Sequence, residues 1–340
     1  ALVMIERELG ARLAGAPGRR LVAGRAGRVL ARSAPLDGRE IETSLDERAQ
    51  AAAERALRSA PGALVAVDPR TGGIRALVSN PEPRAPQRSP ATSGYSPGSA
   101  FKLVTAAAAL EAGVATPPDT VPCPAATTIG EALIRNFEDA GYGSITFEKA
   151  FAVSCNTAFA RVGQAVGAED LLGTAEDLGF RVGELEGPET IAPPSSAGEL
   201  AVWSYGAAGS LASPLGMAGI AATIARGGLT VRPRFTDGHA PGERVLGEQT
   251  TTALVEMMEA VVREGTGQEA AIPGASIAGK TGTADPRRPA GRSDAWFVAL
   301  APARGTRLAV VGFLPEAGLG GGLAAALVRR FLLASTDTGE

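Results

Sequence analysis

The chain of 340 residues contains only three lysines, and two of them stand in short motifs that could together form an acylating serine site. Lys102 closes the run Ser99-Ala100-Phe101-Lys102, and Lys280 opens the run Lys280-Thr281-Gly282-Thr283. A third element, Ser154-Cys155-Asn156, lies between them. Arginine stays protonated in proteins, whereas a desolvated lysine can lose its proton. Because nearly all other cations are arginine, the pattern indicates that an amine is needed at these two positions.

A serine hydroxyl is a poor nucleophile until a neighbouring base takes its proton. The single histidine, His239, stands in the loop Asp237-Gly238-His239-Ala240-Pro241 and is interpreted as a solvated loop residue without neighbouring metal ligands. Lys102 is then the remaining candidate base for Ser99, provided that burial or a second cation lowers its pKa. Lys280 is the candidate for that second cation.

The compositional alternative is that the arginine bias is general and that the two lysines are accidents of sequence. Ser-x-x-Lys alone is a weak pattern, and Lys-Thr-Gly is often a polar strand end. The order of the three motifs, with Ser154 and Asn156 between the two lysines, argues against this alternative.

Elements that could position these residues are visible along the chain. Apolar runs at 63–68, 74–79, 296–300 and 308–314 predict strands, since turn-forming residues separate the two members of each pair. A capping box at Ser44 and Glu47 predicts a helix that ends near Arg58, and the apolar segment 323–333 predicts a final helix. With a mostly helical insertion at about 105–205, the pattern favours an α+β fold whose two ends build one antiparallel sheet.

The motifs fall at the ends of such elements. Pro97-Gly98 predicts a turn, and a helix-forming run follows from Ser99 to Gly113, which places Ser99 and Lys102 on one helical face. The start of a helix also directs free backbone N–H groups toward Ser99, where negative charge would develop. The segment 275–279 predicts an edge strand just before Lys280, and Gly282 would allow a substrate backbone to approach closely.

Composition excludes several classes of function. The formal net charge is −3 with both signs interspersed, so nothing indicates a nucleic-acid surface. No run is long and apolar enough to span a bilayer, and Glu6, Arg7 and Glu8 interrupt any secretory signal near Ala1. No metal or cofactor is expected. We interpret residues 1–40 as the remnant of an upstream domain and a linker, and 41–340 as the catalytic domain.

The three motifs resemble those of the penicillin-recognising family, which comprises penicillin-binding proteins and serine β-lactamases. Several longer segments are also similar to penicillin-binding proteins: 95–99, 146–160, 212–218, 261–284 and 295–297. One departure is Gly206-Ala207-Ala208-Gly209, which stands where these proteins usually show glycine-glutamine-glycine. The resemblance implies the β-lactamase/transpeptidase-like fold, in which helices flank an antiparallel five-stranded sheet and the cleft lies between the sheet and a mostly helical subdomain.

The resemblance also implies roles for the motif residues. Ser99 would be the nucleophile and Lys102 its base, Ser154 would relay a proton to the leaving amine, and Asn156 would hold the substrate backbone and Lys102. Lys280, Thr281 and Thr283 would bind the terminal carboxylate, with Gly282 between them, and the N–H groups of Ser99 and Thr283 would form an oxyanion hole.

The implied function is that of a monofunctional class B D,D-transpeptidase. It would cross-link peptidoglycan stem peptides ending in D-Ala-D-Ala, and β-lactams would acylate it. A serine β-lactamase would need a base for deacylation, and Glu184, Glu186 and Glu189 lie in a Gly/Pro-rich loop without a marking pattern. The motifs are also compatible with a D,D-carboxypeptidase and with a non-enzymatic β-lactam sensor domain.

The family also implies an extracytoplasmic location, through an N-terminal anchor that this chain would lack, and a membrane glycan polymerase as partner. In that oxidising location Cys123 and Cys155 would form a disulfide at the rim of the site. Two buried free thiols are the alternative.

Overall fold

The computed structural model describes residues 2–23, 28–238, 242–284, 293–317 and 320–336. The chain separates into two compact units, residues 1–44 and 45–340. In the first unit, a helix α1 (Leu2–Leu13) precedes an antiparallel hairpin of β1 (Arg20–Ala23) and β2 (Arg28–Arg32). Among the described residues, no helix is both long and apolar enough to cross a membrane.

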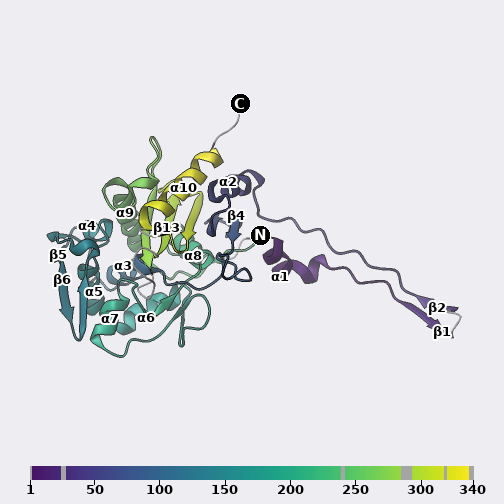
Figure 1. Ribbon diagram of the computed structural model, residues 1–340, viewed down its shortest axis with the longest axis horizontal. Coiled ribbons are helices and arrows are strands. Elements are labelled where there is room, and N and C mark those ends of the chain that lie inside the picture. The colour runs from purple at the N-terminus through teal and green to yellow at the C-terminus, as the bar shows by residue number, and fades with distance from the viewer. Residues whose placement is uncertain (1, 24–27, 239–241, 285–292, 318–319, 337–340) are drawn as a thin grey trace. The chain divides into compact units, whose positions relative to one another are not determined.

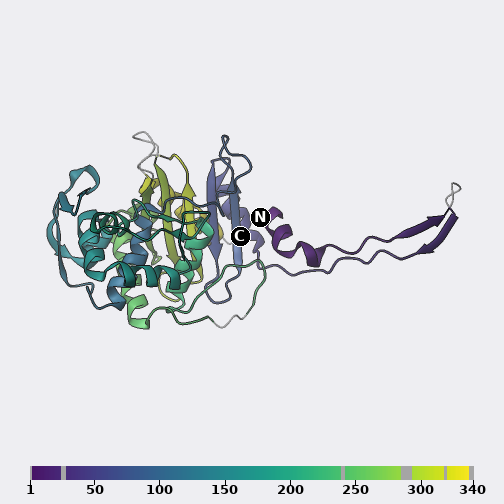
Figure 2. The ribbon, with the colours of Figure 1, turned by 90° about the horizontal axis from the view of Figure 1, so that it is seen from below.

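The second unit is built on an antiparallel sheet of five strands in the order β12-β13-β14-β3-β4. The strands come from both ends of the unit, and Figure 2 shows the blue strands β3 and β4 continuing the sheet of the yellow-green strands. Their bounds are β3 Gly62–Val67, β4 Ile74–Asn80, β12 Ala278–Ala284, β13 Asp294–Ala301 and β14 Leu308–Leu314. This sheet agrees with the sequence-based prediction of a fold in which the two ends pair.

Helices cover both faces of the sheet, which explains why β3 and β13 are buried along their whole length. On one face α2 (Glu47–Leu57) and α10 (Gly320–Thr336) share a hydrophobic core with the strands. α8 (Pro214–Ala225) packs on β3, β13 and β14 (Figure 1). α2 begins at Asp46, whose side chain accepts a hydrogen bond from the Ala49 N–H, and not at Ser44 as the capping box predicted.

The segment between the two halves of the sheet is mostly helical, with small two- and three-stranded pieces. Its helices are α3 Lys102–Glu111, α4 Phe147–Ala152, α5 Asn156–Val166, α6 Ala168–Asp177 and α7 Ala197–Trp203. Two 3-10 turns belong to it, η1 Gly98–Phe101 and η2 Phe137–Asp139. Its strands are β5 Thr120–Cys123, β6 Ala126–Ile129, β7 Ala132–Arg135, β8 Gly143–Thr146, β9 Arg181–Val182, β10 Thr190–Ile191 and β11 Ser210–Leu211. α9 (Glu248–Glu264) and the turn η3 (Gln268–Ala270) then lead to β12.

Candidate active site

Ser99 lies in the 3-10 turn η1, immediately before α3, and β12 runs directly beside this turn. Gly98 has φ 51°, and a Cβ there would collide with the carbonyl oxygen of Thr283. A Cβ on Gly282 would lie 2.7 Å from the carbonyl oxygen of Pro97. Two glycines therefore allow the nucleophile turn and the edge strand to touch. Gly282 lies at this contact, between Thr281 and Thr283, which line the cleft.

Lys102 is the first residue of α3, and its side chain is fully buried. Its Nζ lies 3.0 Å from the Ser99 Oγ, 2.8 Å from the Ser154 carbonyl oxygen, 3.1 Å from the Ser154 Oγ and 2.7 Å from the Asn156 Oδ1. Burial, and then the charge of Lys280, lowers the pKa of Lys102 well below its usual value.

These contacts match the hydrogen-bonding capacity of a neutral amine, which has two N–H donors and one lone pair. The Ser154 carbonyl and the Asn156 Oδ1 can only accept, so they take the two donors. The lone pair is left for a hydroxyl, and the Ser99 hydroxyl can donate to it over 3.0 Å. The arrangement therefore suits proton removal from Ser99.

Ser154 adopts a left-handed backbone conformation, with φ 59°, between α4 and α5. Such a conformation costs on the order of 1–2 kcal/mol for a residue with a side chain. In return, both the carbonyl and the hydroxyl of Ser154 lie within hydrogen-bonding distance of Lys102. Strain of this kind is typical of functional sites.

Lys280 lies inside β12 and is also fully buried. The strand spans residues 278–284, so it carries the whole Lys-Thr-Gly-Thr motif, whereas the sequence placed the strand before it. The Nζ donates to the Ser154 Oγ over 3.0 Å and to the Thr281 carbonyl over 3.1 Å, and it lies 5.4 Å from the centre of the Phe151 ring. Burial lowers the pKa of Lys280 to about 7.

The two lysines therefore meet at one hydroxyl, because both Nζ atoms lie within 3.1 Å of the Ser154 Oγ. Two ammonium groups so close and so buried repel each other strongly. Because the contacts of Lys102 fit a neutral amine, we place the positive charge of the pair on Lys280, in keeping with the lowered pKa of Lys102.

A cleft of about 490 Å³ opens beside these residues. Five of the residues named from the sequence line it: Ser99, Ser154, Asn156, Thr281 and Thr283. Sequence reasoning missed other lining residues, which come from four separate parts of the chain: Arg135, Asn136, Phe137, Glu138, Ala140, Tyr142, Val153, Thr266 and Gly322. Thr266 is tied to the site, since its hydroxyl lies 2.5 Å from the Thr281 hydroxyl. No motif marks it.

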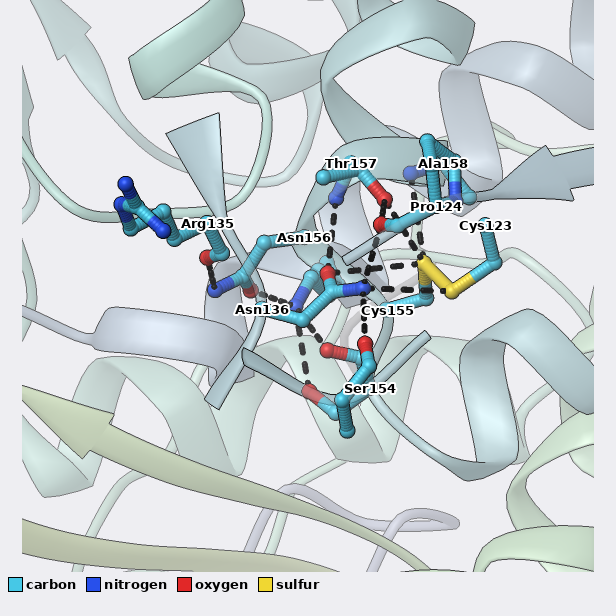
Figure 3. The surroundings of a disulfide bond; sticks show 11 residues. Cys123, Pro124, Arg135, Asn136, Ser154, Cys155, Asn156, Thr157 and Ala158 are labelled. Carbon is cyan, nitrogen blue, oxygen red and sulfur yellow. Dashed lines mark hydrogen bonds between the residues drawn. A yellow bond between two sulfur atoms is a disulfide. The ribbon is translucent and has the colours of Figure 1, made fainter. Parts of the chain in front are cut away.

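One wall of the cleft contains a disulfide between Cys123 and Cys155 (Figure 3). Both cysteines are buried, and Cys155 is the middle residue of the second motif and the N-cap of α5. Asn136 lies beside the disulfide and has an exposed fraction of 7%. The bond joins the end of β5 to Cys155, the residue between Ser154 and Asn156, so it ties these two catalytic candidates covalently to the cleft wall.

The three glutamates considered as bases for deacylation do not reach the cleft. Glu184, Glu186 and Glu189 are not among its lining residues, and Glu189 instead accepts hydrogen bonds from the Ser213 N–H and hydroxyl. His239 falls outside the described residues. Within the described ranges, no group of three or more His, Cys, Asp or Glu residues could hold a metal ion.

Comparison with known proteins defines the class to which this fold and site belong. Residues 62–333 match the family described as the penicillin binding protein transpeptidase domain. The chain therefore belongs to the penicillin-binding protein transpeptidase family, and the sequence-based predictions of the family, of its α+β fold and of a serine-type transpeptidase are confirmed.

Individual relatives support this assignment. The peptidoglycan D,D-transpeptidase PbpA of Mycobacterium tuberculosis H37Rv is 33% identical over 365 residues, covering 88% of this chain and 72% of that protein. The peptidoglycan D,D-transpeptidase FtsI of Escherichia coli K12 is 32% identical over 355 residues, covering 92% and 59%. The structure of penicillin-binding protein A from M. tuberculosis as an imipenem acyl-enzyme complex superposes with a TM-score of 0.79 at 31% identity, covering 88% of this chain and 80% of that one.

Proposed function

We propose that the protein is a peptidoglycan D,D-transpeptidase in which Ser99 forms an acyl-enzyme with stem peptides ending in D-Ala-D-Ala. The observation that carries the proposal is that the buried Lys102 Nζ lies 3.0 Å from the Ser99 Oγ. The Ser154 carbonyl and the Asn156 Oδ1 accept its two N–H groups, so its lone pair is free to accept the Ser99 proton. Its lowered pKa makes it a base at neutral pH.

In the acylation step, the Ser99 Oγ attacks the carbonyl carbon of the penultimate D-Ala while its proton passes to the Lys102 Nζ. Backbone N–H groups of Ser99 and Thr283 hold the oxyanion. Lys102 then has three N–H donors, and the third is shared with the Ser154 Oγ at 3.1 Å. Ser154 passes its own proton to the nitrogen of the leaving D-Ala and regains one from Lys102, so the amine leaves neutral and Lys102 is again a base.

Substrate recognition uses the positive charge of Lys280, which lies next to the Ser154 hydroxyl. The terminal carboxylate of the stem peptide binds near Lys280 and the hydroxyls of Thr281 and Thr283, which line the cleft. The Asn156 amide accepts from Lys102 through Oδ1 and donates one N–H to the Arg135 carbonyl. Its second N–H is directed to an amide carbonyl of the acyl donor.

The acyl-enzyme is resolved by an amine of a second stem peptide, which attacks the same carbonyl and restores the Ser99 hydroxyl. A β-lactam acylates Ser99 by ring opening, so its amine remains attached and blocks entry of the acceptor. We also propose that the protein acts at the extracytoplasmic face of a cell membrane, with an anchor and a glycan polymerase as partner.

The test is intact-mass spectrometry after addition of benzylpenicillin, followed over hours. One adduct that persists is expected for the wild type, and Ser99→Ala and Lys102→Arg should show none, because arginine cannot act as a base. Acylation of Lys102→Arg at the wild-type rate would refute the role of Lys102. A transient adduct with hydrolysis of the drug would favour a β-lactamase instead.

A further inference from the structure

Asn136 is a buried amide that joins three parts of the cleft wall. Its Nδ2 donates to the Pro124 carbonyl over 2.9 Å and to the Ala140 carbonyl over 2.8 Å. Its Oδ1 accepts from the Thr157 N–H over 3.1 Å, in the first turn of α5. The Thr157 hydroxyl donates to the same Pro124 carbonyl over 2.8 Å. Both N–H groups of the Asn136 amide therefore donate a hydrogen bond and its oxygen accepts one. Figure 3 shows Asn136 with Pro124 and Thr157 beside the disulfide.

The main chain of this segment fixes the orientation of the Asn156 side chain. The Asn156 Nδ2 donates to the Arg135 carbonyl over 2.9 Å, while Oδ1 accepts from Lys102 over 2.7 Å. A flipped amide would place oxygen against the Arg135 carbonyl and N–H groups against those of a neutral Lys102. The position of the Arg135 carbonyl, next to Asn136 in the chain, therefore decides which way Asn156 faces the cleft.

The segment after Asn136 does not hold this geometry by local preference. Glu138 and Asp139 have φ 53° and 52°, a left-handed conformation that is unfavourable for two successive residues with side chains. Such backbone persists only where surrounding contacts determine it. Here the contacts include the side-chain bonds of Asn136, the bond from the Asn136 N–H to the Ala125 carbonyl at 3.0 Å and the bond from the Tyr142 N–H to the Cys123 carbonyl at 2.9 Å. Arg135 and Asp139 also form an ion pair at 2.9 Å.

We propose that Asn136 is a positioning residue for transpeptidation, which holds the Arg135 carbonyl and the start of α5 so that Asn156 presents its free N–H to the acyl donor. The inference rests on the proposed function. It predicts that Asn136 matters most for acyl donors that carry an amide carbonyl beside the reacting centre. Benzylpenicillin carries such an acylamido group, and imipenem carries a hydroxyethyl group in its place.

The test compares acylation rates of Asn136→Ala with both drugs. We expect the rate with benzylpenicillin to fall on the order of tenfold to a hundredfold, as for displaced positioning groups, and the rate with imipenem to fall less than about threefold. Asn80→Ala is the matched control, because the Asn80 Nδ2 also donates to two backbone carbonyls, those of Arg58 and Ala60. Asn80 lies on β4, the strand at the sheet edge opposite β12. The control should leave the ratio of the two rates unchanged.

A purely structural role would slow acylation by both drugs alike. The proposal is therefore overturned if both acylation rates fall equally, or if the ratio of the benzylpenicillin rate to the imipenem rate stays within about twofold of the wild-type ratio. If Asn136→Ala does not fold, Thr157→Val decides. This substitution removes the hydrogen bond from the Thr157 hydroxyl to the Pro124 carbonyl at nearly constant side-chain volume. It should lower the ratio of the benzylpenicillin rate to the imipenem rate by about threefold. Acylation of wild-type Ser99 tests the proposed function separately, so the two failures are distinguishable.

Discussion

Replacing Lys280 by methionine should flatten the dependence of stability on pH. Burial lowers the pKa of Lys280 from 10.5 to about 7, so the folded state binds fewer protons than the unfolded state between these values. Stability therefore rises with pH in this window, and the cost of burial is largest at and below about pH 7. From about pH 7 to about pH 9, linkage gives a gain of about 2 kcal/mol in the free energy of unfolding from Lys280 alone.

The fully buried Lys102 contributes a slope of the same sign, because its pKa is also lowered. The assay is urea unfolding of the wild type and Lys280→Met at a series of pH values across this window. The variant should lose at least about 2 kcal/mol of the wild-type gain. Lys149→Met is the control, since Lys149 lies at the surface in an ion pair with Glu264 at 2.8 Å. Equal slopes for the wild type and Lys280→Met would refute the assignment of a depressed pKa to Lys280.

Three further predictions concern the elements around the site. Gly98→Ala should lower the free energy of unfolding by at least about 2 kcal/mol and slow acylation, because a Cβ collides with the Thr283 carbonyl; wild-type stability in urea unfolding would contradict this. The double variant Cys123→Ala/Cys155→Ala should lose about 3–4 kcal/mol on the chain-entropy model for a separation of 32 residues. Unchanged unfolding without reductant would refute a stabilising bond. Trp296→Phe should cost about 1–3 kcal/mol, because the indole N–H of the fully buried Trp296 donates to the Ser96 carbonyl over 3.0 Å, and unaltered thermal stability would argue against it.

The sequence indicated which residues lie together at the candidate site, because the motifs carry their own chemistry. A lysine three residues after Ser99 shares its helical face, and this local geometry survives although Ser99–Phe101 form a 3-10 turn and not the start of the α-helix. That Lys280 and Ser154 would join them followed from resemblance, not from spacing. Four of the five strands were predictable because they are apolar runs bounded by turn residues, whereas β12 carries the polar Lys-Thr-Gly-Thr motif and was placed too early in the chain.

The rest depends on tertiary contacts that leave no local pattern. The left-handed backbone of Ser154 is held by the surrounding site, and nothing in the residue type announces it. Asn136 looks like an ordinary loop residue, since the carbonyls and the N–H group that it bonds belong to three separate segments. That Gly282 admits a substrate backbone stays a prediction, and the structure adds that a Cβ there would meet the Pro97 carbonyl. A close approach was readable from glycine, but the Pro97 partner was not.

The burial of two of the three lysines has a practical consequence for handling the protein. All three lie in the described part of the chain, and only Lys149 reaches solvent, with a side chain 35% exposed on α4. Among the lysine side chains, amine-reactive dyes and surface couplings should therefore modify only Lys149, with the α-amino group of the chain as the other amine open to such reagents. Immobilisation through Lys149 would leave every molecule in the same orientation, with the buried amines of the cleft untouched by the reagent.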